Sequence, residues 1–396
     1  MTQRFVPRVL RPRRAAPADA VRPTRAEINL DALRRNLRVV ARHAAGARVW
    51  AVLKADAYGH GAPAVARTLE RARVDGFCVA LLEEGVELRE AGIVAPILVM
   101  GGHYDNGHEE VIARGLVPVV CDVGQIAAFA RLVRTGAAQG PIDVHVKVDT
   151  GMGRLGVTMR ALPELADKLA SYPEVRVRGL MTHLACTDAP GDEDTTEQTV
   201  RFEEATALLA HRGVYPEVRH AANSAAVLRG RARFDAVRPG LALFGVAPRV
   251  QGRSLTTELR PVMRVRTEVI ALRDIDAGAP LGYGATWKAS RRTRVATLPM
   301  GYADGLSRRL GNCGHVLLRG RRAPIVGAVS MDMTMVDVTD AAGVSVGDEA
   351  VVLGAQEGPL GRDAIDADEI AARADTIAWE VLTSISRRVP RFYREP

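Results

Sequence analysis

Residues 49–61 read VWAVLKADAYGHG and place a lysine, Lys54, at the end of an apolar run. A continuous apolar run of this length predicts a strand that is buried on both faces, over Val49–Lys54. A buried ammonium group is unfavourable unless it is paired or neutralised. An imine with an aldehyde such as pyridoxal phosphate is one way to neutralise it. A solvated lysine that caps the strand is the alternative, and the rest of the chain decides between the two.

The composition is typical of a globular protein with two domains, or with one large domain and an appendage. The chain has 396 residues, of which 47% are hydrophobic and 25% charged. Its formal net charge is +8, but residues 1–25 contain seven arginines and one acid, Asp19, which account for +6 of it. The remainder is near neutral, so the charge does not predict nucleic-acid binding. We expect residues 1–25 to form a basic, disordered arm.

The apolar runs and the cysteine spacing predict neither membrane targeting nor disulfide bonds. No apolar run approaches about 18 residues, and no sustained apolar region follows the first arginines, so we expect neither a membrane span nor a secretory signal. The cysteines lie far apart, at Cys78, Cys121, Cys186 and Cys313. That spacing argues against a zinc site or a disulfide framework and is typical of a reducing cytosol. We therefore expect a cytoplasmic protein without a bound metal.

From Ala26 onward, strand and helix patterns alternate. Eight stretches predict buried strands: Val49–Lys54, Phe77–Leu81, Ile97–Met100, Val117–Cys121, Val144–Val148, Val177–His183, Val218–Ala222 and Ala236–Arg238. Most gaps between them carry helix patterns, such as Glu83–Gly92 and Thr196–Ala210. Eight such units in about 220 residues predict a (β/α)8 barrel of the TIM type. A doubly wound sheet is the alternative, but no G-x-G-x-x-G turn follows the first strand.

Polar side chains gather where these strands end, which is where the chemistry of a (β/α)8 barrel occurs. The residues at or just after predicted strand ends are Lys54, Tyr58, Lys147, Asp149, Arg154, His183, His220, Asn223, Ser224 and Arg238. Ordinary capping would place Ser, Thr and Asp at such positions. This set instead contains several cationic side chains and two histidines, so it predicts an active site.

After about Arg260 the pattern changes to short alternating segments separated by turn residues, which predict a mostly-β domain. We expect the barrel over residues 26–258 and the second domain over 259–396, with one last helix over Asp366–Ser386. The predicted strands of the second domain are Val262–Ala271, Arg294–Pro299, His315–Leu318, Ala323–Val329, Met333–Val338 and Glu349–Leu353. Two loops place Tyr283 and Tyr302 among glycines, where exposed backbone can approach a ligand closely.

These residues resemble those of alanine racemases. Residues 51–61 resemble that family's pyridoxal-phosphate lysine motif, and the likeness extends from about Ala26 to Tyr393. Further motifs agree in order: VKVDTGMGRLG over Val146–Gly156, Met181–His183, His220–Ala225, Val237–Arg238, GYGATW around Tyr283, Gly301–Gly305, Ser330–Asp332 and Arg388–Arg391. The resemblance implies an isomerase that interconverts L-alanine and D-alanine with pyridoxal 5'-phosphate. It also implies a head-to-tail homodimer of barrel and β domain that supplies D-alanine for peptidoglycan.

The resemblance further implies two catalytic groups, one on each face of the reacting carbon. Lys54 holds the cofactor in the resting enzyme and then acts on one face, and Tyr283 of the partner subunit acts on the other. A buried lysine among other cations has a lowered pKa, which a general base needs. A tyrosine with a pKa of ~10 is a poor base at neutral pH unless positive charge lies nearby. Arg154 is suited to supply that charge while it contacts the substrate carboxylate.

Other roles follow from the same resemblance. Arg238 is expected at the cofactor's pyridine nitrogen, where an arginine donates and cannot protonate the nitrogen as an Asp would, and His220 is expected to orient it. The expected cofactor-binding residues are Lys54, Tyr58, His183, Ser224, Arg238, Tyr302 and the backbone N–H groups of Gly240 and Leu241. Lys147 matches a position that carries a carbamate in many members. Met331 is expected to contact the substrate carboxylate, with Asp332 in support.

One departure from the family concerns Trp379, which stands where a tyrosine is usual. Tryptophan is larger and has a donor but no acceptor, so we hypothesise a narrowed or reshaped substrate pocket. Steady-state kinetics of Trp379→Tyr test this, and unchanged kcat and KM for every substrate would remove the idea. Phe244 likewise replaces a tyrosine that is more common in the family.

Alternative functions stay open. One is a racemase of a different or broader set of amino acids, such as serine, and another is a barrel-type pyridoxal-phosphate decarboxylase. Those decarboxylases generally use a catalytic cysteine in the β domain, and Cys313 does not stand in that context. A non-enzymatic cofactor-carrier barrel would lack the β domain altogether.

Overall fold

The structure is a computed structural model that describes residues 20–102, 107–189, 191 and 193–395. Most of the expected basic arm, residues 1–19, therefore lies outside the described residues. The chain divides into two compact units. Unit 1 contains the described residues up to Ile28 together with Met263–Phe392, and unit 2 contains Asn29–Val262 with the residues after Phe392. Among the described residues, no helix has the length and apolar character that a membrane crossing requires.

Unit 2 is built on a closed ring of parallel strands, which confirms the predicted (β/α)8 barrel. The ring order is β5-β4-β3-β2-β10-β9-β8-β6, and β6 pairs with β5 to close it. The strands are β2 (Arg48–Val52), β3 (Gly76–Leu81), β4 (Ile97–Gly102), β5 (Val117–Val120), β6 (Ile142–Asp149), β8 (Val175–Met181), β9 (Val218–His220) and β10 (Ala236–Val237). Each predicted barrel strand overlaps one of these. A short strand, β7 (Val157–Thr158), pairs with β6.

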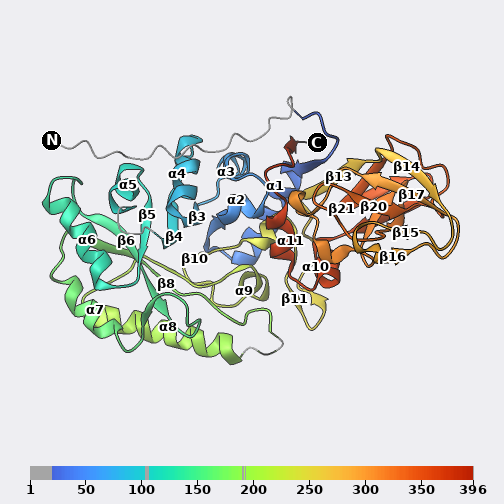
Figure 1. The fold of residues 1–396 in the computed structure, drawn as a ribbon. Helices are drawn as coiled ribbons and strands as arrows, with labels where there is room; N and C mark the ends of the chain where they lie inside the picture. The colour runs from blue at the N-terminus through green and yellow to red at the C-terminus, as the bar shows by residue number, and fades with distance from the viewer. Residues whose placement is uncertain (1–19, 103–106, 190, 192, 396) are drawn as a thin grey trace, which may run out of the picture. The chain divides into compact units, whose positions relative to one another are not determined.

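Helices surround the ring, as Figure 1 shows for α5, α6, α7 and α8. The helices of unit 2 are α1 (Leu30–Ala44), α2 (Lys54–Tyr58), α3 (Ala62–Arg71), α4 (Leu82–Glu90), α5 (Gly107–Ala113), α6 (Val123–Arg134), α7 (Leu162–Leu169), α8 (Glu193–His211), α9 (Ser224–Arg229) and the 3-10 helix η2 (Leu241–Phe244). Helix α1 illustrates why they form. Its apolar residues recur on one buried face, and the side chain of Asn29 accepts a hydrogen bond from the N–H of Ala32 at its start.

Unit 1 is mostly β, also as predicted. Its larger sheet has the order β19-β18-β21-β13-β1-β23, with β22 paired to β21, and a smaller sheet has the order β14-β17-β20. The strands are β1 (Arg25–Asn29), β13 (Met263–Glu268), β14 (Ala271–Ile275), β15 (Pro280–Leu281), β16 (Trp287–Lys288), β17 (Thr293–Leu298), β18 (His315–Leu318), β19 (Arg321–Pro324), β20 (Thr334–Asp337), β21 (Glu349–Gly358), β22 (Gly361–Ile365) and β23 (Arg391–Arg394).

The predicted last helix, Asp366–Ser386, is wrong as a single element. The chain forms two helices, α10 (Ala367–Ala374) and α11 (Ala378–Ser384). Asp375 ends the first helix in the left-handed region, with φ 53°, and Ile377 begins the second from an extended backbone. The apolar period continues across the break because both helices bury the same kinds of side chain, so periodicity alone does not reveal it.

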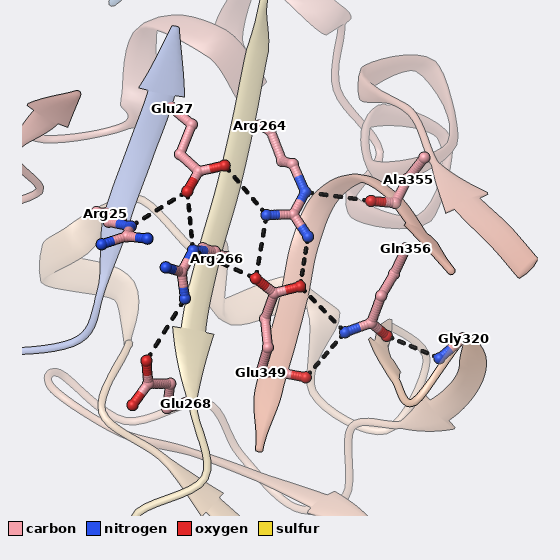
Figure 2. A network of polar contacts seen from close by, with 9 residues as sticks. All are labelled: Arg25, Glu27, Arg264, Arg266, Glu268, Gly320, Glu349, Ala355 and Gln356. Atoms are coloured by element: carbon pink, nitrogen blue, oxygen red, sulfur yellow. Dashed lines mark hydrogen bonds and ion pairs between the residues drawn. The ribbon is translucent and has the colours of Figure 1, made fainter. Parts of the chain in front are cut away.

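Strand β1 is held in the sheet of unit 1 by ion pairs as well as by backbone hydrogen bonds. Glu27 is 5% exposed and contacts Arg25, Arg264 and Arg266 at 3.2, 3.2 and 2.9 Å. Arg264 and Arg266 lie on β13 and also reach Glu349 on β21 (Figure 2). A nearly buried carboxylate is stable only when it is paired in this way. The start of the chain's described part is therefore an integral part of unit 1.

Candidate active site

Lys54 and Tyr58 lie on a left-handed turn directly after β2. The strand ends at Val52, so the predicted strand over Val49–Lys54 is too long. The residues Ala55–Tyr58 have φ between 52° and 56°, a conformation that costs about 1–2 kcal/mol for each non-glycine residue. The N–H of Ala57 donates to the carbonyl of Leu53 at 2.8 Å and closes the turn. Backbone strain of this kind persists only where the surroundings hold it in place.

Glu84, near the start of α4, supplies one such contact. Its Oε1 accepts the N–H of Ala55 at 2.6 Å, and its Oε2 accepts the N–H groups of Ala80 and Leu81 at 2.8 and 3.1 Å. One carboxylate therefore ties the left-handed turn after β2 to the end of β3. Asp56 adds a second contact, because its Oδ1 accepts the N–H of Ala62 at 2.7 Å. The position of Lys54 thus depends on residues of two neighbouring β/α units.

Positive charges gather around Lys54. Burial, and after it the charge of Arg154, lowers the pKa of Lys54, while Glu84 raises it. Burial also lowers the pKa of Lys147 on β6, an effect that Cys121 opposes and Arg238 and Arg154 increase. Burial, followed by Arg238 and Arg154, lowers the pKa of His183 to about 3. The surroundings therefore shift both lysines toward the neutral amine and keep the His183 imidazole neutral at neutral pH, while Arg154 lies exposed in the loop after β6.

Arg238 is buried and ends a chain of polar side chains. Its Nη1 donates to Nδ1 of His220 at 2.7 Å, and its Nη2 donates to the carbonyl of Thr182 at 2.7 Å. Because arginine only donates, Nδ1 of His220 is an acceptor and the proton of that ring is on Nε2. This Nε2 lies 2.7 Å from Nδ1 of His145 and donates to it. The chain of contacts thus assigns one tautomer to each histidine.

The surroundings of His145 keep this chain in place. The ring of Trp50 packs against both histidines, with centroids 5.3 Å from His145 and 5.6 Å from His220. A Cβ added to Gly179 would lie 2.2 Å from Nδ1 of His145, so only glycine leaves room for the ring there. Burial, and after it the charge of Arg238, lowers the pKa of His145 to about 3, and His220 is shifted in the same direction. Both rings are neutral at neutral pH.

A group of polar side chains and backbone N–H groups lies at the ends of β9 and β10. The hydroxyl of Ser224 accepts the N–H groups of Gly240 and Ala242 at 2.9 and 3.2 Å. The ring of Tyr58 packs against Phe244, with centroids 5.1 Å apart. A Cβ added to Gly240 would lie 2.3 Å from the hydroxyl oxygen of Tyr58. The phenol, the serine hydroxyl and the backbone before η2 therefore lie in one place, and Leu241 begins η2 beside them.

The remaining predicted site residues belong to unit 1. Tyr302 and Met331 lie in adjacent loops, because the N–H groups of Tyr302 and Ala303 donate to the carbonyls of Ser330 and Met331 at 3.0 Å each. Tyr302 also lines a cavity of about 440 Å³. The exposed Asp332 forms an ion pair with Arg388 at 2.7 Å.

Tyr283 and Trp379 differ in their exposure. Tyr283 is 74% exposed, on a short 3-10 turn (Tyr283–Ala285) between two glycines with positive φ. Trp379 lies half-buried on α11. Among the described residues of unit 1, no hydrogen bond joins Tyr283 to the loops of Tyr302 and Met331.

Sequence reasoning missed Glu84 and His145. Glu84 resembles an ordinary acid in the first turn of a helix, and nothing local distinguishes it from Glu83. His145 had a usable signal, because it is two residues before Lys147 and alternate residues of a strand point to the same face. That period places the histidine on the same side of β6 as Lys147.

Comparisons with known proteins cover most of the chain, including both units. Residues 28–248 match the family model described as alanine racemase, N-terminal domain, and residues 262–393 match the model of its C-terminal domain. An alanine racemase of Sorangium cellulosum is 60% identical over 383 residues, covering 95% of this chain and 100% of that protein. One of Symbiobacterium thermophilum is 45% identical, covering 95% of this chain and 98% of that protein.

Solved structures of alanine racemases also resemble this chain in fold. The alanine racemase of a D-cycloserine-producing Streptomyces lavendulae has a TM-score of 0.88 at 33% identity and covers 95% of this chain and 98% of its own. That of Bartonella henselae, solved with covalently bound pyridoxal phosphate, has a TM-score of 0.84 at 30% identity and covers 94% of this chain and 99% of its own.

Proposed function

The chain belongs to the alanine racemase family, an isomerase family, and we propose that it interconverts L-alanine and D-alanine with pyridoxal phosphate held by Lys54. The observation that carries this proposal is the position of Lys54. It is half-buried at the carboxyl end of a barrel strand, on a strained turn, with its pKa lowered by burial and by Arg154. A neutral amine in that position is a nucleophile for an aldehyde and, when released, a general base.

The residues around Lys54 fit the cofactor. The hydroxyls of Tyr58 and Ser224 and the backbone N–H of Leu241 offer donors for a phosphate, and the N–H of Gly240 holds the Ser224 hydroxyl beside them. Gly240 is required there, because a Cβ would collide with the Tyr58 hydroxyl. Arg238 is buried and remains a donor, as a pyridine nitrogen that stays unprotonated requires. His220 orients Arg238 through the 2.7 Å contact.

Racemisation needs a group on each face of the reacting carbon. Pyridoxal phosphate, when bound, delocalises the electron pair that remains after the α-proton is removed. On one face, Lys54 removes that proton as a neutral amine, or returns it from the ammonium form. On the other face the same role falls to Tyr283 of the partner subunit. The high exposure of this tyrosine in a single chain supports the proposal that a second chain covers it.

Arg154 and Lys147 act together in this proposal. Arg154 binds the substrate carboxylate and lowers the pKa of Lys54. Lys147 has its own pKa lowered by burial, which favours the neutral amine that reacts with carbon dioxide to form a carbamate. A carbamate would be anionic and would hold the guanidinium of Arg154.

Met331 and Tyr302 contribute to the substrate side, with Asp332 in support, and Trp379 shapes the pocket. The D-alanine product would supply peptidoglycan synthesis.

Exchange of the α-proton in deuterated water tests the function directly. The full-length chain with pyridoxal phosphate should exchange the α-proton of both alanine enantiomers, and a coupled assay should detect D-alanine formed from L-alanine. A panel of amino acids that includes serine measures substrate breadth in the same experiment.

Lys54→Ala should abolish both the exchange and the absorbance band near the visible edge that a lysine–cofactor bond produces. Lys168→Ala is the matched control, because Lys168 is exposed on α7. Exchange that survives in Lys54→Ala would contradict the proposal, and exchange with serine but not alanine would favour the alternative substrate.

A further inference from the structure

We propose that an N-terminal strap, residues Arg22–Thr24, positions the substrate-side loop Met300–Gly305 of unit 1. The strap lies outside both matched family models, the first of which begins at residue 28. The loop carries Tyr302 and is hydrogen-bonded to the backbone of Met331. The assignment of these two residues to the substrate side rests on the function proposed above, whereas the contacts between strap and loop are independent of it.

The strap holds the loop through a buried ion pair. Arg22 Nη1 and Nη2 donate to the two carboxylate oxygens of Asp304 at 2.9 and 2.7 Å, in a bidentate arrangement. Asp304 is fully buried, whereas Arg22 is 29% exposed. The hydroxyl of Thr24, also fully buried, donates to the carbonyl of Pro299 at 2.7 Å. Thr24 therefore contacts the residue just before the loop, and Arg22 contacts Asp304 near its end.

Asp304 also forms a hydrogen bond within the loop. Its Oδ2 also accepts the N–H of Gly301 at 3.1 Å, so the carboxylate bridges the loop internally. Tyr302 lies between these two residues. A Cβ added to Gly301 would lie 2.2 Å from the carbonyl oxygen of Ser330. The loop is therefore packed directly against the turn that contains Met331.

Other partners of Asp304 do not replace Arg22. Arg388 reaches the same carboxylate only at 3.5 Å through Nε, and its Nη2 is used by Asp332 at 2.7 Å. Loss of Arg22 would leave a fully buried carboxylate with one long ion pair, which is unfavourable. The loop would relieve this by moving Asp304 toward solvent, and this movement would displace Tyr302. Arg22 is thus a positioning residue that acts through Asp304.

Hydrogen exchange together with steady-state kinetics tests the strap. Arg22→Gln in the full-length chain should speed amide exchange in the peptides that contain residues 300–305 and 329–333. With the cofactor-loaded enzyme it should raise KM for alanine by about three- to tenfold with little change in kcat, because it weakens uniform binding. Arg22→Lys keeps the charge without the bidentate geometry and should give an intermediate result. Arg25→Gln is the control, since Arg25 is equally exposed and pairs with Glu27 instead.

The outcomes separate the strap from the proposed function. Unchanged exchange in both peptides would overturn the strap whatever the activity. Faster exchange with an unchanged KM, in an active enzyme, would overturn its role toward substrate and leave the racemase function intact. An equal rise in KM for Arg25→Gln would show a general loss of stability and would also overturn the proposal. A wild-type chain without alanine exchange would refute the proposed function, while the exchange data still decide the strap.

Discussion

Glu84 shows how a single carboxylate can determine where a lysine stands. Its two oxygens accept three backbone N–H groups, one from the turn after β2 and two from the end of β3. The charge of the same carboxylate also raises the pKa of Lys54. Position and basicity of the lysine are therefore coupled through one side chain that touches neither substrate nor cofactor in the proposed site.

Glu84→Gln should lower the free energy of unfolding by about 1–3 kcal/mol, because an amide NH₂ would face an N–H donor that had been satisfied. It should also lower kcat/KM, because Lys54 moves with the turn. Chemical denaturation and steady-state kinetics measure the two effects. Glu83→Gln is the matched control, since Glu83 is the exposed neighbour on the same helix. Equal effects of the two substitutions would refute the role of Glu84.

His145 predicts a dependence of stability on pH. Its pKa is about 3 in the folded chain, against about 6.5 when unfolded. Between these values the unfolded state binds a proton that the folded state does not. The stabilising contribution is therefore present above pH 6.5 and falls as the pH drops, by about 1.4 kcal/mol for each pH unit.

His145→Gln should reduce the slope of this acid limb by about 1.4 kcal/mol for each pH unit, because glutamine can accept from Nε2–H of His220 and does not titrate, whereas His183 and His220 still contribute. Urea denaturation between pH 4 and 8 measures the slope for both chains. An acid limb of unchanged slope in the variant would show that His145 is not responsible for it.

At the scale of elements, the left-handed turn after β2 is the least expected feature of the barrel. Ala and Tyr disfavour positive φ, although Asp tolerates it more readily, and no local pattern in residues 55–58 indicates it. The turn forms because Glu84 and the carbonyl of Leu53 accept the N–H groups of Ala55 and Ala57, because Asp56 ties the turn to Ala62 at the start of α3, and because Tyr58 packs on Phe244.

Ala55→Gly should leave stability unchanged or raise it by up to about 1 kcal/mol, because glycine adopts positive φ without strain. Ala41→Gly, at an exposed position within α1, should instead destabilise by about 1 kcal/mol. Thermal unfolding compares the two. A loss at Ala55 as large as at Ala41 would mean that the turn is not strained at that residue.

At the scale of the whole molecule, the proposed active site needs two chains. If Lys54 works with Tyr283 of the partner subunit, Lys54→Ala and Tyr283→Ala chains should each be inactive alone. After subunits exchange, half the dimers are mixed and each mixed dimer has one intact site. About a quarter of wild-type racemase activity should then return.

The coupled D-alanine assay on equimolar mixtures measures this recovery. A mixture that stays inactive, although subunit exchange is verified with differently tagged chains, would place both groups in one chain. Mixing Lys54→Ala with Arg238→Ala chains is the control, because both residues come from the same barrel. That mixture should recover nothing.

Much of the fold was predictable from local pattern. Each barrel strand was expected within a few residues, because a strand buried on both faces is a continuous apolar run bounded by polar residues. The mostly-β character of unit 1 followed from alternation and turn residues. The break at Asp375 was missed, because both helices keep the same apolar period.

The sequence by itself determined the barrel, the second β unit and the set of side chains at the strand ends, since all three depend on residues near one another in the chain. Only the tertiary structure decided which contacts hold these side chains in position. Glu84 and Ala55 are 29 residues apart, His145 and His220 are 75 apart, and Arg22 and Asp304 are 282 apart. Contacts over such separations leave no periodic trace, because each depends on how strands and loops pack rather than on the order of their residues.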